Sequence, residues 1–490
     1  MKMNLFSFSQ YQDMKKIAIL LLACLSMSCA NSQKKVANKK IAGLWEGKIN
    51  AGAPLRIVFH FDPQADSSYA GIMDSPDQNV KGIHCDSVKI TGDSVSVKVL
   101  VISGGFTGHI INDTTIIGNW TQRGMQIALT LKKEKAVSIL NRPQTPQRPF
   151  SYNSQDVEYD NEDKTVHFGA TLTWPKGEGP FPTAIMITGS GQQDRDETIF
   201  GHKPFAVIAD YLTKKGYAVL RIDDRGMGKT TGDVKNATSV DFAKDIETAL
   251  AYLKTRKEVD KKRIGMIGHS EGGLIASLVA SRNTDINFII MLAGPGVKGS
   301  ELMLAQAKAA LESVGISTHA ADVYGLIYKK ITDDVITEKD TAKLYDKIMA
   351  DFTQWRKNQP KALLDTLNIH DDEDYTKKIV LAFTRGLESP WMKYFLQSDP
   401  QPLMEKFTCK VLALDGSKDI QVISSLNLDG INKALKKSKS PSFETKELPG
   451  LNHLFQHCKT CTVAEYGQLE ETFSPEALDI MGKWLDQNVK

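Results

Sequence analysis

The sequence has no marked excess of charge of either sign. Its 490 residues include 61 Lys and Arg and 58 Asp and Glu, a net charge of +3 at pH 7. Proteins that bind nucleic acid present concentrated basic surfaces, so no nucleic-acid partner is expected. With 41% hydrophobic and 24% charged residues, the composition is that of a folded protein of two or three domains.

Cysteine is also scarce, with six residues in the chain. Cys458 and Cys461 have the spacing of zinc ligands, and His453 and His457 lie close to them in the sequence. A second cysteine pair at that spacing is missing, although most structural zinc sites need one. We therefore expect no metal, and we expect free or locally paired thiols.

Long apolar runs are absent beyond the N-terminal segment, so no other part of the chain is expected to span a membrane. In that segment the basic pair Lys15-Lys16 precedes the short apolar run from Ile17 to Ala23. A basic pair before a run too short to cross a bilayer is typical of a secretory signal peptide, here residues 1–29.

The end of this segment resembles a bacterial lipoprotein signal, in which a cysteine becomes the lipidated first residue. Small residues lead to Cys29 and a polar tract follows it, whereas Cys24 would leave a very short apolar run. Ser26 stands where such signals usually carry Leu, so cleavage by the ordinary signal peptidase stays open. In both cases we expect export, as a periplasmic protein or as a membrane-anchored lipoprotein.

Residues 41–133 consist of short apolar runs separated by Gly, Asp and Asn. The clearest run, from Ser87 to Val101, alternates apolar and polar residues as a half-buried strand does. Short strands at regular spacing predict a small all-β barrel or sandwich. It contains no catalytic constellation, so we expect a structural or substrate-presenting domain. Three prolines then predict an extended linker over residues 141–155.

Residues 156–488 alternate buried apolar strands with amphipathic helices, which predicts a doubly wound, mostly parallel α/β sheet. The expected strands are residues 181–188, 217–222, 263–267, 287–293, 410–415 and 444–448, and the expected helices are residues 204–215, 240–253, 272–281 and 474–488. Residues 297–403 interrupt the alternation with charged, helix-rich sequence. Their position between two core strands favours an inserted helical lid, and a helical decoration without a substrate role is the alternative.

One motif carries chemistry directly. Gly268-His269-Ser270-Glu271-Gly272 matches G-x-S-x-G, with a strand expected before it and a helix after it. In this context the glycines let a sharp turn close and present the Ser270 hydroxyl at the positive end of the helix. The backbone N–H of Glu271 can then stabilise an oxyanion. We predict Ser270 to be a nucleophile.

An acid and a histidine follow in the order that such a nucleophile requires. Asp415 and Asp419 compete as the acid after the strand over residues 410–415, and Asp419 is favoured because it lies beyond the glycine turn. His453 lies in a loop after the next strand, where the general base belongs. His269 and His457 are the rival histidines.

These segments resemble the α/β-hydrolase superfamily, and more narrowly bacterial secreted esterases, serine aminopeptidase-like, with a lipocalin-like N-terminal domain. The resemblance rests on the three segments above, on Asp224 to Gly228, and on the run from Thr188 to Glu197. That run matches the family's oxyanion loop, with Thr188 in place of the usual His. The resemblance implies that the Ser190 N–H joins that of Glu271 in the oxyanion hole. Asp194-Arg195-Asp196 is either a structural ion-pair network or a substrate contact.

The resulting hypothesis is a serine hydrolase that acts on a small-molecule ester through an acyl-enzyme, with no cofactor. A carboxylesterase for small acyl or carbohydrate-linked esters is preferred. The alternatives are a serine peptidase or aminopeptidase for short peptides, and a non-catalytic binding protein on a hydrolase scaffold. The absence of an internal repeat argues against the oligopeptidases that carry a propeller.

Replacement of the predicted lipid-bearing residue tests the export hypothesis. We expect Cys29→Ser to move the protein from the membrane fraction to the soluble fraction, because a lipidated N-terminus is the only expected anchor. Cell fractionation and immunoblotting measure the change. An unchanged distribution would instead favour a soluble periplasmic protein.

Overall fold

The computed structural model describes residues 41–50, 54–64, 66, 68–76, 80–122, 125–137, 141–370 and 372–490. The predicted signal peptide over residues 1–29, with Cys24 and Cys29, lies outside these residues. The chain divides into two compact units with a boundary between Asn141 and Arg142. Within the described ranges, no helix combines the length and the apolar character needed to cross a membrane.

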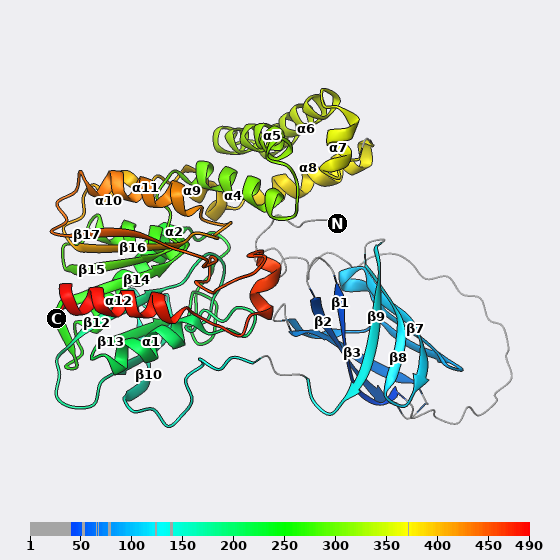
Figure 1. Ribbon diagram of the computed structural model, residues 1–490, viewed down its shortest axis with the longest axis horizontal. Coiled ribbons are helices and arrows are strands. Elements are labelled where there is room, and N and C mark those ends of the chain that lie inside the picture. The colour runs from blue at the N-terminus through cyan, green and yellow to red at the C-terminus, as the bar shows by residue number, and fades with distance from the viewer. Residues whose placement is uncertain are drawn as a thin grey trace. The chain divides into compact units, whose positions relative to one another are not determined.

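The N-terminal unit is one antiparallel sheet (Figure 1). Its strands are β1 (Gly43–Asn50), β2 (Pro54–Pro63), β3 (Tyr69–Ser75), β4 (Val80–His84), β5 (Ser87–Thr91), β6 (Ser94–Val99), β7 (Gly104–Asn112), β8 (Thr115–Gln122) and β9 (Met125–Glu134). Strand β9 returns to pair with β1, and the Cys85 N–H, just before β5, donates to the Gly71 carbonyl of β3 at 2.9 Å. The sheet therefore coils until its edges meet, and the predicted all-β domain is confirmed.

The interior of this sheet is aromatic. The fully buried side chains are Trp45, Phe59, Phe61, Phe106 and Trp120. They share one face because successive residues of a strand point to opposite sides. In β6 the three valines are buried while Ser94 and Lys98 are exposed, which is the alternation seen in the sequence.

The C-terminal unit is built on an eight-stranded sheet in the order β10-β11-β13-β12-β14-β15-β16-β17. Its strands are β10 (Asn153–Asp160), β11 (His167–Trp174), β12 (Phe181–Ile187), β13 (Ala218–Ile222), β14 (Val259–His269), β15 (Ile286–Leu292), β16 (Lys410–Gly416) and β17 (Phe443–Leu448). Neighbouring strands from β13 to β17 run parallel, while β10 and β11 are antiparallel. The predicted doubly wound, mostly parallel sheet is confirmed.

Helices cover both faces of this sheet (Figure 1). Helices α1 (Pro204–Lys214) and α12 (Pro475–Asn488) contact each other, and α2 (Ser239–Leu253) contacts α3 (Glu271–Ala280). Helix α11 (Ser424–Leu435) packs on β16 and β17. All residues of α3 are buried, which explains why its sequence is apolar on every side.

Between β15 and β16 the chain is helical, as residues 297–403 predict. The helices are α4 (Gly299–Ser313), α5 (Thr318–Thr337), α6 (Thr341–Lys357), α7 (Lys361–Thr366), α8 (Glu373–Leu387), α9 (Pro390–Gln397) and α10 (Gln401–Met404). Helices α4 and α9 lie next to the sheet unit, and α5 to α8 extend beyond them (Figure 1). Tyr324, Tyr328 and Phe352 belong to a separate hydrophobic cluster of the insertion. The insertion thus has a core of its own.

The segment predicted as a linker is partly integrated into the C-terminal unit. Arg142 donates from both terminal nitrogens to the carbonyls of Leu469 and Gly467, at 2.6 and 2.7 Å. Gln144 Nε2 donates to the Phe473 carbonyl at 2.7 Å. The assignment of residues 153–155 to the linker is wrong, because they belong to β10. Strands β10 and β11 and helix α11 were not among the expected elements.

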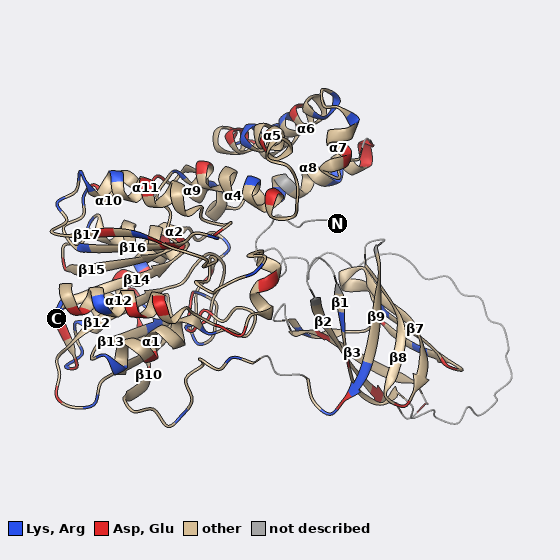
Figure 2. Ribbon diagram, viewed as in Figure 1, with Lys and Arg blue, Asp and Glu red and all other residues tan. Residues whose placement is uncertain are grey.

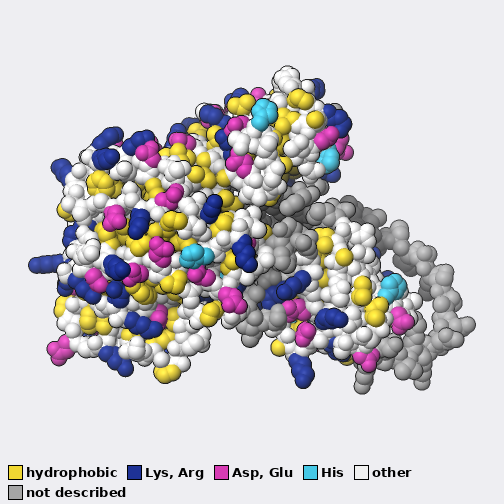
Figure 3. Space-filling view, viewed as in Figure 1, with side chains coloured by type: hydrophobic (Ala, Val, Ile, Leu, Met, Phe, Trp, Pro, Cys, Tyr) yellow, Lys and Arg dark blue, Asp and Glu magenta, His cyan; other side chains and the backbone are white. Residues whose placement is uncertain are grey.

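Charged residues of both signs are interspersed along the elements of the eight-stranded sheet and its insertion (Figure 2). On the face of this unit in Figure 3, basic and acidic side chains also alternate, with hydrophobic side chains among them. Many are i,i+4 pairs within one helix, such as Lys329 with Asp333 in α5 and Lys483 with Asp479 in α12. Such exposed pairs contribute at most about 1 kcal/mol each to stability.

Two truncated proteins test where the C-terminal unit begins. A protein starting at Asn141 should melt cooperatively. One starting at Phe150 should melt lower by about 3 °C or more, because it loses the hydrogen bonds of Arg142 and Gln144. Circular dichroism during heating measures both. Equal melting temperatures, or an unfolded protein from Asn141, would contradict the boundary.

Candidate active site

The candidate residues come from loops that follow four parallel strands. Thr188 to Ser190 follow β12, Ser270 follows β14, Asp419 follows β16 and His453 follows β17. Parallel strands bring their carboxyl ends to one edge of a sheet, and α/β proteins bind ligands at that edge. The strand order therefore gathers loops that are far apart in the sequence.

Ser270 occupies a sharp strand-to-helix turn. Its backbone has φ 52° and ψ −122°, a combination that residues other than glycine rarely adopt. A Cβ atom on Gly268 or Gly272 would collide with backbone atoms, so the turn requires glycine on both sides. The Ser270 N–H donates to the Leu292 carbonyl at 2.8 Å. Ser270 also precedes α3 directly, where the helix dipole is positive.

His453 and Asp419 form a buried pair. Nδ1 of His453 lies 2.6 Å from Oδ2 of Asp419, and the two side chains are 6% and 0% exposed. Oδ1 of Asp419 accepts from the N–H groups of Gln421 and Val422 at 2.7 and 2.9 Å. When Nδ1 donates to this carboxylate, Nε2 of His453 carries the lone pair that can accept a proton. No hydrogen bond joins the Ser270 hydroxyl to His453 among the described residues, and such contacts often tighten only when substrate binds.

The competing residues lie elsewhere in the site. Asp415 is buried at the end of β16, where its Oδ1 accepts from the Gly416 N–H at 2.8 Å. Burial and the nearby charge of Asp419 raise the pKa of Asp415 well above its usual value. His457 is largely exposed and contacts Glu471 at 2.9 Å.

The loop that carries His453 is stabilised by hydrogen bonds between its own residues. Oδ1 of the fully buried Asn452 accepts from the N–H groups of Leu454 and Gln456, both at 3.0 Å. Just beyond, Cys458 and Cys461 form a disulfide. The expectation of locally paired thiols is confirmed for these two cysteines. Their sulfur atoms are bonded to each other and are not zinc ligands as they stand.

The loop after β12 passes directly beside Ser270. A Cβ atom on Gly189 would lie 3.1 Å from Cβ of Ser270. Thr188, which replaces the family's usual His, donates its hydroxyl to Oδ1 of Asp224 at 2.7 Å. Oδ2 of Asp224 accepts from the Gln193 N–H at 2.9 Å. Burial raises the pKa of Asp224 well above its usual value, and its two hydrogen bonds anchor the loop.

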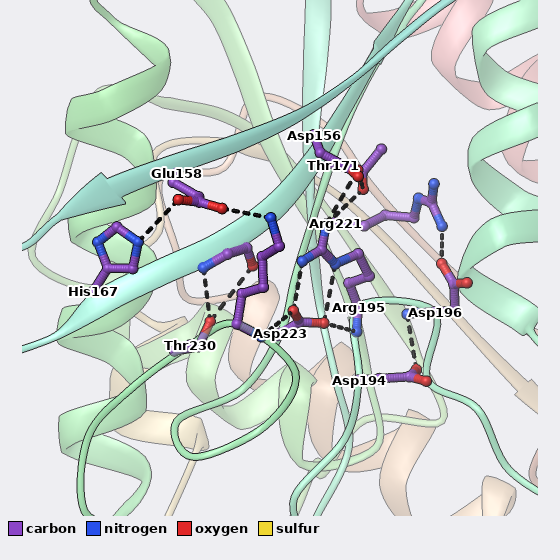
Figure 4. A network of polar contacts seen from close by, with 12 residues as sticks. Asp156, Glu158, His167, Thr171, Asp194, Arg195, Asp196, Arg221, Asp223 and Thr230 are labelled. Atoms are coloured by element: carbon purple, nitrogen blue, oxygen red, sulfur yellow. Dashed lines mark hydrogen bonds and ion pairs between the residues drawn. The ribbon is translucent and has the colours of Figure 1, made fainter.

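The Asp194-Arg195-Asp196 segment forms an ion-pair network (Figure 4). Arg195 makes a bidentate pair with Asp223 at 3.0 and 2.6 Å, and its N–H donates to the same carboxylate at 2.9 Å. Asp196 pairs with Arg221, and Asp194 accepts from the Asp196 N–H at 3.0 Å. Of the two readings of this motif, the contacts favour the structural network, which fixes the loop after β12 to β13.

Glu271 connects the turn at Ser270 to the insertion. Its buried Oε1 accepts from the Ser239 hydroxyl at 2.6 Å and from Nε1 of Trp391, in α9, at 2.7 Å. Burial raises the pKa of Glu271 even though both hydrogen bonds lower it. The insertion therefore touches the residue that follows Ser270.

Sequence reasoning missed Glu197, which lies inside the oxyanion-loop run, and Trp391, one of several aromatic residues in the insertion. Oε1 of Glu197 accepts from the Gly189 N–H at 2.7 Å and contacts Nδ1 of His269 at 2.9 Å. A buried Glu next to a buried His has no periodic signature, so only the fold reveals the pair.

The sequence is similar to known proteins over part of its length. The family described as serine aminopeptidase, S33, matches residues 203–370. Esterase EstD of Thermotoga maritima is 32% identical over 172 residues, which cover 35% of this chain and 41% of that protein. The C-terminal unit has the fold of an α/β hydrolase.

Other proteins are similar to parts of the chain. The putative hydrolase YtaP of Bacillus subtilis is 32% identical over 133 residues, covering 24% of this chain and 44% of that protein. The chain thus spans less than half the length of these curated relatives. The structure of the Pyrococcus furiosus esterase Pf2001 is 16% identical, with a TM-score of 0.41, and covers 72% of this chain and 100% of that one. The family match includes Ser270 and ends before Asp419 and His453.

Substitution of Arg195 tests the structural role of the network in Figure 4. Arg195→Gln should lower the free energy of unfolding by about 3–5 kcal/mol, because it leaves the buried Asp223 carboxylate without its cation. Urea unfolding at pH 7 measures the loss. Arg282→Gln, which breaks an exposed pair with Glu247, is the control and should cost less than about 1 kcal/mol. Equal effects would contradict the assignment.

Proposed function

We propose that the protein is a serine hydrolase that cleaves carboxylic esters through an acyl-enzyme. The observation that carries the proposal is the buried contact of 2.6 Å between His453 and Asp419, in a loop beside the strained turn at Ser270. A histidine oriented by a carboxylate next to a serine at the start of a helix is the arrangement that activates a hydroxyl for acyl transfer.

The steps follow from this arrangement. His453 accepts the proton of the Ser270 hydroxyl at Nε2 while the oxygen attacks the ester carbonyl. Asp419 keeps the required tautomer and stabilises the imidazolium. His453 then protonates the leaving alcohol, which departs to give the acyl-enzyme. Water, deprotonated by His453, attacks the acyl group and releases the acid and the free serine.

The developing oxyanion requires donors, and we assign the N–H groups of Ser190 and Glu271. Neither N–H donates to another described residue, and both belong to segments that lie against Ser270. Glu271 opens α3, so its N–H also points along the positive end of the helix dipole. The chemistry requires neither a metal nor a cofactor.

Small acyl or carbohydrate-linked esters are the proposed substrates, since an esterase is among the relatives. The match to a family described as serine aminopeptidase favours short peptides as the second candidate. A panel of nitrophenyl esters against aminoacyl nitroanilides separates the two. Faster turnover of the nitroanilides at equal concentration would replace the esterase proposal with the peptidase.

The nucleophile is tested by Ser270→Ala. The expected loss of ester hydrolysis is about 10⁴-fold or more, because the oxyanion donors and binding alone sustain only about 10³–10⁴-fold over water. Ser281→Ala, at the other end of α3 with its hydroxyl on the Leu278 carbonyl, is the matched control and should keep full activity. A Ser270→Ala protein within tenfold of the wild type would refute the assignment.

The acid is tested by comparing two aspartates on the same turn. Asp419→Asn should reduce kcat by about 10⁴-fold, because the amide favours the wrong imidazole tautomer. Asp415→Asn should reduce it far less, since Asp419 is the carboxylate that contacts His453, whereas Asp415 accepts from the Gly416 N–H. Steady-state kinetics at pH 7 measure both. The reverse order would assign the acid to Asp415.

A further inference from the structure

His269, directly before Ser270, lies between two hydrogen-bond acceptors. Its Nδ1 is 2.9 Å from Oε1 of Glu197, and its Nε2 is 3.0 Å from the backbone carbonyl of His453. The His269 and Glu197 side chains are only 8% and 5% exposed, so water does not replace either contact. The Glu197 oxygen also accepts from the Gly189 N–H at 2.7 Å.

The hydrogen bonds limit the His269–Glu197 pair to two protonation states. A backbone carbonyl can only accept, so Nε2 of His269 must carry a hydrogen. A Glu197 carboxylate can also only accept, so Nδ1 must carry one as well. An imidazole with hydrogens on both nitrogens is a cation. The alternative, a neutral His269, needs a proton on Glu197 itself.

We propose that His269 is an imidazolium paired with the Glu197 carboxylate, and that this buried pair positions the oxyanion loop and the His453 loop around Ser270. The role of the pair rests on the proposed function, whereas its charge state does not. Glu197 holds the Gly189 N–H, and His269 holds the His453 carbonyl. One ion pair thus connects the loops after β12, β14 and β17.

The surrounding charges support the cationic form. Burial lowers the pKa of His269, but the Glu197 charge and hydrogen bond, the His453 carbonyl and the Asp419 charge together raise it above its usual value. The His453 ring lies 4.8 Å away, centroid to centroid, and is paired with Asp419. The charge of Glu197 is also among the causes that raise the pKa of the nearby Asp224 carboxyl. Glu197 therefore supplies the negative charge that His269 needs.

Glu197→Gln distinguishes the effect of the ion pair from the effect of side-chain packing, because it removes the charge and keeps nearly the same shape. The amide oxygen can accept from Gly189, but a neutral His269 cannot then donate from both nitrogens, so one hydrogen bond is lost. If the amide turns its NH₂ toward Nδ1 instead, the Gly189 N–H loses its acceptor. Either outcome loosens one loop beside Ser270.

Nitrogen NMR of the full-length protein, selectively labelled with ¹⁵N-histidine, tests the charge directly. We expect both His269 nitrogens to carry hydrogens at pH 7, with the signals assigned by their shift in Glu197→Gln. His202 is an internal control, because burial and the Arg142 charge lower its pKa to about 4 and it should carry a single ring hydrogen. A bare nitrogen on His269 at pH 7 would overturn the proposal, whether or not the protein is active.

Kinetics test the positioning role. Glu197→Gln should lower kcat about 10- to 100-fold, equivalent to losing one hydrogen bond of a charged group, with KM within about threefold. The ion pair is lost as pH rises through the raised pKa of His269, so the wild type should lose activity in alkaline solution. Glu197→Gln lacks the ion pair at every pH and should not show this decline. His457→Asn, at an exposed histidine four residues after His453, should change neither value. An unchanged kcat and pH profile in Glu197→Gln would refute the role.

Discussion

Burial of a carboxylate costs several kcal/mol unless cations or N–H groups meet it, and the loops at the carboxyl edge of the hydrolase sheet bury several. Asp223 meets Arg195, Asp419 meets His453, and Glu197 meets His269. Each partner comes from a different loop. Satisfying the buried charge therefore fixes the loops relative to one another, and the geometry of the site follows from these pairs.

The strained turn at Ser270 depends on the same constraint. Its backbone conformation is costly and persists because neighbouring elements leave no room for another. Gly268 and Gly272 admit the close backbone contacts, the Leu292 carbonyl takes the Ser270 N–H, and the buried α3 cannot shift. The strain is offset by packing and hydrogen bonds that any relaxed turn would lose.

Most of the strands and helices that contact the core could be predicted from the sequence, since their apolar periodicity is set by burial on the sheet, but β10, β11 and α11 were not. Strand β10 was missed because its exposed residues are polar or charged and its apolar positions are few, while β11 has Gly169, Thr171 and Thr173 between its apolar residues. The G-x-S-x-G turn could be located because glycine is sterically required there.

The choice between Asp415 and Asp419 depends on the conformation of the loop after β16, which sequence spacing does not determine. Glu197, Asp223 and Trp391 could not be found, because their partners lie about 30 to 120 residues away in segments that only the folded sheet brings together.

Glu271 connects the insertion to the turn at Ser270. Its N–H is assigned to the oxyanion, while its carboxyl holds Trp391 of α9 and Ser239 at the start of α2. A buried carboxyl is held in place by its hydrogen bonds, since breaking one leaves an unpaired polar group in the interior. A movement of α9 must therefore strain or release Glu271, the residue whose N–H we propose as an oxyanion donor. In this arrangement the insertion can influence the rate of acyl transfer as well as the access of substrate, through a single hydrogen bond to Trp391.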